Sequence, residues 1–133
     1  SNTREDFQEA YKFGSVVIPA RKALSLGAEE VIKMIPEAKN YYVTIDIDGY
    51  DMCYAPGVGS PSPGGLNYLF ETDVLEGIAK KGNVVGFDLV EVAPQYDPSG
   101  ITCRLGAMTM LAFLGYIMKE RELKKQLKAQ SAH

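Results

Sequence analysis

The sequence has few of the residues from which disulfide scaffolds and histidine-based metal sites are built. Its two cysteines, Cys53 and Cys103, have neither a metal-binding spacing nor the number that a disulfide framework needs. Such sparse cysteine is typical of a reducing compartment, and we expect a cytoplasmic protein. The one histidine, His133, ends the chain, where frayed tails are common, so we expect it to bind nothing. We recognise no signal peptide at the start.

The chain also lacks a strong charge of either sign. A formal net charge of −3 over 133 residues gives no electrostatic reason to expect nucleic acid or an anionic membrane as a partner. The apolar stretch 101–118 is interrupted by Arg104 and small residues, and we expect it to be too short to span a membrane. Hydrophobic content of 46% and charged content of 23% predict a soluble globular protein with a single domain over 1–133.

The most informative stretch that is present runs from Tyr41 to Gly65. Its first part is rich in β-branched and aromatic residues and predicts a buried strand over 41–48, followed by a loop rich in glycine and proline. Residues i and i+2 of a strand share a face about 6–7 Å apart, so Asp46 and Asp48 direct two carboxylates to one place. One or two divalent cations would offset their repulsion. Alternatively, the acids cap the turn at Gly49.

The rest of the chain predicts strands and helices in alternation. A second buried strand over 83–92 ends near Glu91, and a long helix is predicted from about Thr102, with a helix end and frayed tail over 119–133. The other predicted elements are helices over 3–11, 28–35 and 66–81, a turn or short helix over 19–27, and a short strand over 15–18. This order predicts an α/β domain with a mostly parallel sheet covered on both faces.

Three acidic residues lie where these strands end. Sites of parallel sheets lie outside the carboxyl ends of the strands, and a crossover through the 66–81 helix would make the two long strands neighbours. We therefore expect Asp46, Asp48 and Glu91 to converge on one edge of the sheet.

Taken together, these blocks resemble the signature of the ureohydrolases, the family of arginase, agmatinase and formiminoglutamase. The resemblance spans about Phe13 to Met118 and is closest in look to agmatinase. The matching residues are Asp46-Ile47-Asp48, Asp51, Ala55–Pro61 and Gly64-Gly65, then Gly86–Pro94 with Tyr96-Asp97, and finally Gly100-Ile101-Thr102.

The resemblance implies an arginase-like three-layer α/β/α fold, represented here by its C-terminal half. It implies a binuclear manganese hydrolase of polyamine metabolism that cleaves a guanidinium C–N bond and releases urea, and that forms homo-oligomers. In that family the first Asp of the motif bridges the metals and the second binds one of them, which assigns Asp46 and Asp48 as metal ligands. Glu91 would be the catalytic and substrate-binding residue, pairing with the cationic guanidino group.

Other positions depart from the family pattern. Met52, Val58 and Ser60 replace a usual proline and two threonines, which leaves the identity of the substrate open. The chain also has no run like GGDH or DAHxD, and these runs carry the family's remaining metal ligands. Since two carboxylates do not complete a two-metal site, we expect the chain alone to be inactive.

Two alternatives stay open. A magnesium-dependent phosphotransferase of the haloacid dehalogenase type also has an apolar strand followed by D-x-D-G, with the first Asp as nucleophile. Here, however, Tyr50 follows Gly49, and the acids lie in the middle of the chain. The other alternative is a non-catalytic assembly module that retains the fold. The length of the natural open reading frame would separate a module from part of an enzyme.

Overall fold

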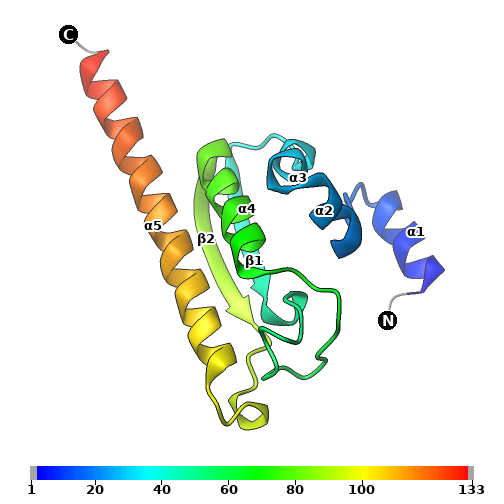
Figure 1. Ribbon diagram of the computed structural model, residues 1–133. Coiled ribbons are helices and arrows are strands. Elements are labelled where there is room, and N and C mark those ends of the chain that lie inside the picture. Colours follow the sequence, from blue (N-terminus) through cyan, green and yellow to red (C-terminus); the bar gives the residue numbers. More distant parts are fainter. Residues whose placement is uncertain (1–2, 132–133) are drawn as a thin grey trace.

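A two-stranded parallel sheet forms the centre of the computed structural model, which describes residues 3–131. Strand β1 (Asn40–Asp46) pairs with β2 (Asn83–Val90), in a register that places Asn40 opposite Asn83 and Asp46 opposite Val90. The parallel pairing predicted from the sequence is confirmed. Helix α4 (Tyr68–Lys81) connects the strands, and α5 (Ile101–Gln130) follows β2 (Figure 1).

The core lies between one face of this sheet and the helices α4 and α5. Ile45 and Val84 contribute the buried strand residues, while Leu75 comes from α4 and Phe113 from α5. The rings of Phe87 and Phe113 meet edge to face, with centroids 4.9 Å apart. The buried residues of α5 recur every three or four positions, at Thr102, Gly106, Thr109, Phe113 and Ile117, as a helix that covers a sheet requires.

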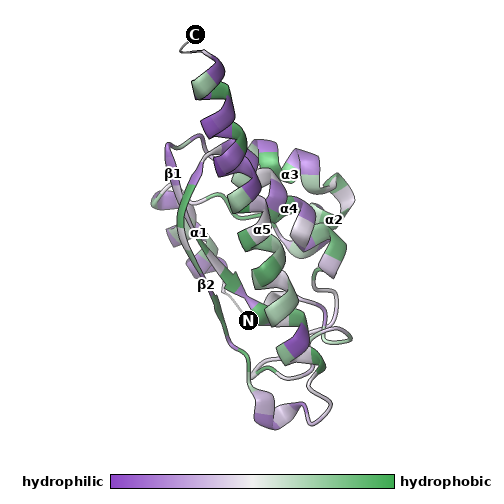
Figure 2. Ribbon diagram, turned by 90° about the vertical axis from the view of Figure 1, so that its left-hand side faces the viewer, coloured by the Kyte–Doolittle hydropathy of each residue, from purple (hydrophilic) through white to green (hydrophobic). Residues whose placement is uncertain are grey.

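The opposite face of the sheet is not covered by the described residues. Figure 2 shows α4 and α5 to one side of the strands, and on the other side Tyr42 is 63% exposed. Its hydroxyl donates to Asp88 Oδ2 at 2.7 Å. Asp88 Oδ1 is buried and has no hydrogen-bond partner within residues 3–131. Within residues 3–131 the helices thus cover one face of the sheet, and the second helix layer of the expected three-layer fold is not formed by the described residues.

Three shorter helices precede the sheet. They are α1 (Arg4–Lys12), α2 (Ala20–Leu26) and α3 (Ala28–Met34), close to the predicted helices. Helix α3 packs tightly on α4, since a Cβ at Gly77 would lie 2.1 Å from Ile32 Cδ1. The strand predicted over 15–18 is wrong: these residues have no regular secondary structure, and Val16 is 51% exposed.

Helix α5 is the longest element and extends well beyond the sheet (Figure 1). One 18-residue window has a mean hydropathy of 1.5, so by length and composition alone the helix could cross a membrane, contrary to our expectation from the sequence. A core helix of a soluble protein can have the same length and composition, although only 28% of this stretch is buried within the described residues. Residues 119–130 are helical; His133 and the last predicted tail residues lie outside the described range.

Cys53 and Cys103 are free and exposed.

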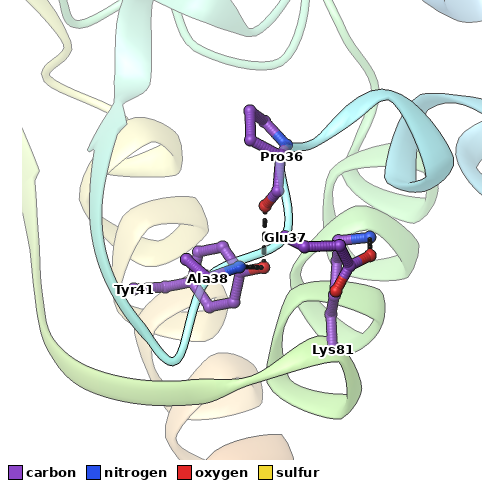
Figure 3. Close-up of polar contacts among 5 residues, drawn as sticks. All are labelled: Pro36, Glu37, Ala38, Tyr41 and Lys81. Atoms are coloured by element: carbon purple, nitrogen blue, oxygen red, sulfur yellow. Dashed lines mark hydrogen bonds and ion pairs between the residues drawn. The ribbon is translucent and has the colours of Figure 1, made fainter.

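The amino-terminal end of the sheet is held by polar contacts (Figure 3). The Tyr41 hydroxyl donates to the carbonyl oxygen of Pro36 at 2.9 Å and accepts from the amide of Ala38 at 3.0 Å. Lys81, at the end of α4, forms an ion pair with Glu37. These contacts attach the segment before β1 to both the strand and α4.

Candidate metal and substrate site

The two predicted metal-binding acids lie where β1 turns. The strand ends at Asp46, two residues earlier than predicted, and Ile47–Gly49 form a short 3-10 turn. Asp46 Oδ1 accepts from the amide of Asp48 at 3.2 Å, while Ile47 is completely buried and anchors the turn. The capping alternative is thus correct for Asp46. Capping occupies one of its oxygens and leaves the carboxyl groups of both acids at the same edge of the sheet.

Asp48 is affected by the charges of both other predicted site residues. The pKa of Asp48 is raised above its usual value, first by burial, then by the charge of Asp46 and a hydrogen bond with it, and last by the charge of Glu91. No lysine or arginine in the described part of the chain forms an ion pair with any of the three. This edge therefore gathers negative charge without a balancing cation.

Glu91 has an unusual backbone conformation. Strand β2 ends at Val90, so Glu91 is the first residue beyond it rather than a strand residue as predicted. It has φ of 67° and is the one non-glycine residue within 3–131 with a positive φ. Such conformations cost about 1–3 kcal/mol and concentrate at functional sites. The carboxylate faces the loop from the first strand, since a Cβ on Gly59 would lie 3.8 Å from Glu91 Oε2.

The donor set for a metal ion is partial. No group of three or more His, Cys, Asp and Glu side chains in the described residues is placed to hold a metal. Asp46 and Asp48 supply two carboxylates, the ligand type suited to manganese and magnesium. The pKa of Asp48 is raised first by burial and then by the charge of Asp46, and because a bound cation would offset both effects, these two residues fit one part of a metal site.

The loop that follows β1 is closed on itself by Asp51. Asp51 Oδ1 accepts from the amide of Cys53 at 2.9 Å, and Oδ2 accepts from the amide of Gly64 at 2.6 Å. These amides lower the pKa of Asp51. The backbone closes the same loop, because Asp51 N donates to Leu66 O at 2.9 Å. Sequence reasoning placed Asp51 in a motif but gave it no role; here it sets the shape of one wall of the site.

The loop that follows β2 is organised by Asp97, which the sequence analysis placed in a family block without giving it a role. Asp97 is 6% exposed and accepts from the hydroxyl and amide of Ser99 and from the amide of Thr102, the last at 2.7 Å. The Ser99 hydroxyl first, and the Thr102 amide next, lower the pKa of Asp97 to about 2. An Asp followed two residues later by Ser, just before a helix, is a capping signal that could have identified it.

Comparisons with known proteins agree on one family. A family model described as the arginase family matches residues 1–115. The mitochondrial agmatinase of Gallus gallus is 48% identical over 73 residues, which are 55% of this chain and 21% of that protein. The guanidinobutyrase of Pseudomonas aeruginosa is 35% identical over 115 residues, which are 84% of this chain and 36% of that protein.

Solved structures have the same architecture. The agmatine ureohydrolase of Thermoplasma volcanium matches with a TM-score of 0.80 and 31% identity, covering 92% of this chain and 41% of that one. The formimidoylglutamase of Bacillus subtilis matches with a TM-score of 0.81 and 27% identity, covering 88% of this chain and 38% of that one. The chain thus spans well under half the length of the relatives that it matches.

Proposed function

Since the chain belongs to the arginase family and forms part of an arginase-like α/β fold, we propose that it carries part of a manganese-dependent ureohydrolase site. In this proposal Asp46 and Asp48 hold metal and Glu91 holds a guanidino group. The observation that supports it most directly is that Asp46 and Asp48 lie together at the turn that ends β1, where the Asp48 amide donates to Asp46 Oδ1 at 3.2 Å. The charge of Glu91 also acts on Asp48, and no lysine or arginine within residues 3–131 forms an ion pair with any of the three acids. Family membership removes the haloacid dehalogenase alternative.

The residues of this chain would do two kinds of work. Asp46 and Asp48 would hold the cations, which when bound supply activated water for attack on a planar carbon. Because two carboxylates fill only part of the coordination of such ions, the 133-residue chain should bind manganese weakly and turn over no substrate. A non-catalytic assembly module is the second candidate, favoured by this partial donor set.

Glu91 would recognise and orient the substrate. A carboxylate pairs with a guanidinium through two parallel hydrogen bonds, which fixes the plane of the group as well as its position. The carboxylate of Glu91, whose backbone has a positive φ, faces Gly59 in the loop that follows β1. A small guanidino compound of the agmatine or guanidinobutyrate type is the proposed substrate, since relatives of the chain are named for acting on such compounds.

Paramagnetic broadening by Mn²⁺ tests the metal proposal on this chain, because it detects weak binding. Amide NMR signals of 46–49 and Glu91 should broaden first when Mn²⁺ is added. Asp46→Asn should abolish this pattern, whereas Asp73→Asn, at an exposed position on α4, should leave it intact. Broadening centred on other acids, or the same pattern in Asp46→Asn, would refute the assignment.

Urea release separates the roles of metal and substrate residues, in a catalytically competent protein that contains these residues. Glu91→Gln keeps the shape but removes the charge, and losing one partner of a desolvated ion pair costs about 3–5 kcal/mol. That corresponds to a loss in kcat/KM of roughly a hundredfold to several thousandfold. Manganese content should stay near that of the wild type, whereas Asp46→Asn should lose metal and activity together. If Glu91→Gln also loses its metal, Glu91 is a ligand.

A further inference from the structure

The two loops that border the site are joined at one residue, Gly57. Its amide donates to the side-chain hydroxyl of Thr102, at the start of α5, with an N–O distance of 2.7 Å. Its carbonyl oxygen accepts from the amide of Ala93, in the loop after β2, at 2.8 Å. Both backbone polar groups of Gly57 are therefore bonded to residues that follow β2.

This junction has no room for a larger residue at position 57. A Cβ at Gly57 would lie 2.6 Å from Asp97 Cβ and 2.9 Å from Thr102 Oγ1. Thr102 is completely buried. Because a buried amide that loses its partner cannot turn to solvent, the Gly57 amide depends on the Thr102 hydroxyl.

Asp97 in turn fixes Thr102. Its Oδ2 accepts from the amide of Thr102 at 2.7 Å, and its Oδ1 accepts from Ser99. This bond holds the backbone of Thr102 in the first turn of α5 and hence fixes where the Thr102 hydroxyl lies. A continuous series of bonds therefore runs from Asp97 through Thr102 to Gly57.

The junction is close in sequence to both walls of the site. Gly57 is two residues from Gly59, which faces the Glu91 carboxylate. Ala93 is two residues from Glu91 itself. A displacement at Gly57 would therefore change the separation between Gly59 and the Glu91 carboxylate.

We propose that Thr102, held by Asp97, is a positioning residue that keeps Gly59 and the Glu91 carboxylate at the separation that the guanidino group requires. The inference rests on the proposed function for what that separation serves, but the bond between Gly57 and Thr102 can be tested without activity. It predicts that the hydroxyl of Thr102, rather than its bulk, controls the geometry at Gly59 and Glu91.

Amide exchange and NMR shifts of the 133-residue chain test this inference. Thr102→Val removes the hydroxyl at nearly constant size, and exchange of the Gly57 amide should become at least about tenfold faster, as expected for the loss of one buried hydrogen bond. The amide signals of Gly59 and Glu91 should shift as well. Thr102→Ser should restore both. The matched control is Thr72→Val, because Thr72 is a buried helical threonine whose hydroxyl bonds only to carbonyls of its own helix.

Each outcome decides the question. Unchanged exchange at Gly57, or faster exchange without shifts at Gly59 and Glu91, would overturn the positioning role whether or not the chain binds manganese. If Thr102→Val does not fold, Asp97→Asn replaces it, and smaller shifts at the same residues are expected; their absence would overturn the inference. Shifts as predicted in a chain that fails the Mn²⁺ test would support the junction and refute the proposed function instead.

Discussion

The two ends of the β1–β2 sheet satisfy their polar groups in opposite ways. At the amino-terminal end, the Tyr41 hydroxyl makes two hydrogen bonds and Lys81 pairs with Glu37 (Figure 3). Asn83 also donates to Asn40 Oδ1 at 3.0 Å. At the carboxyl-terminal end, acids of like charge gather around the β1 turn, and the backbone at Glu91 has a positive φ.

The difference separates stabilising from binding roles. At the amino-terminal end the charges of Lys81 and Glu37 balance each other, so this end has no unpaired charge of the kind that attracts a ligand. Unbalanced carboxylates and a strained residue lower stability unless something binds them, and proteins retain such conflicts mainly where function requires them. Mutations at the two ends should therefore act with opposite signs on stability, apart from those that alter the rigid loops.

The largest effect is expected where the loop backbone is most crowded. A Cβ at Gly65 would lie 2.4 Å from the amide nitrogen of Asp51 and 2.5 Å from the carbonyl carbon of Tyr50. Gly65→Ala should lower the free energy of unfolding by about 1–3 kcal/mol, the usual range for overpacking, as measured by urea denaturation. Gly49→Ala is the control, because a Cβ at Gly49 meets nothing within 4 Å. Equal losses in both variants would show that crowding does not hold this loop.

The next effect concerns the paired end. Tyr41→Phe removes two hydrogen bonds and should lower the free energy of unfolding by about 0.5–1.5 kcal/mol. Tyr54→Phe should change it little, since the Tyr54 hydroxyl has no hydrogen-bond partner among residues 3–131. A neutral Tyr41→Phe would mean that water replaces both bonds, and the contrast between the two ends would lose its main support.

A gain of stability is expected at Glu91. Glycine adopts a positive φ without the penalty of about 1–2 kcal/mol that other residues incur, although it loses about 0.5–1 kcal/mol of backbone entropy on folding. Glu91→Gly should therefore be more stable than Glu91→Ala by about 0.5–1 kcal/mol, a comparison in which neither variant keeps the charge. Thermal and urea unfolding of the pair measure the difference. A less stable Glu91→Gly would show that the conformation is not strained.

The elements that the sequence predicted correctly are those whose apolar pattern matches the final packing. Ile45 and Phe113 face the core as the periodicity of their elements requires. Val16 belonged to an apolar run too, but no described strand pairs with it, and the run stays irregular. A local pattern reports apolar character and does not identify a partner.

The site was predictable in its residue types and less so in its geometry. Asp46, Asp48 and Glu91 could be placed at strand ends because parallel strands end at a common edge. The positive φ of Glu91 and the bond from Gly57 to Thr102, which are 45 residues apart, depend on long-range packing. No short window of sequence contains that information.

The smallest effect distinguishes two acids three residues apart. The pKa of Asp48 is raised from 3.8, mainly by burial and by Asp46, whereas that of Asp51 is lowered from the same value by backbone amides. A raised pKa means that the folded state holds the proton more tightly, so wild-type stability falls as pH rises from 3.8 through the pKa of Asp48. Asp51 acts in reverse: its contribution to stability is present above pH 3.8 and is lost as pH falls through its lowered pKa.

Without metal, Asp48→Asn should be more stable than the wild type at pH 7 and equal to it at low pH. Asp51→Asn should be less stable than the wild type at pH 7, and the difference should vanish in acid. Urea denaturation between pH 2.5 and 7 would be run on both variants. Curves for Asp48→Asn that lie below the wild type at neutral pH would mean that the charge of Asp48 already has a partner in the fold and does not await a cation.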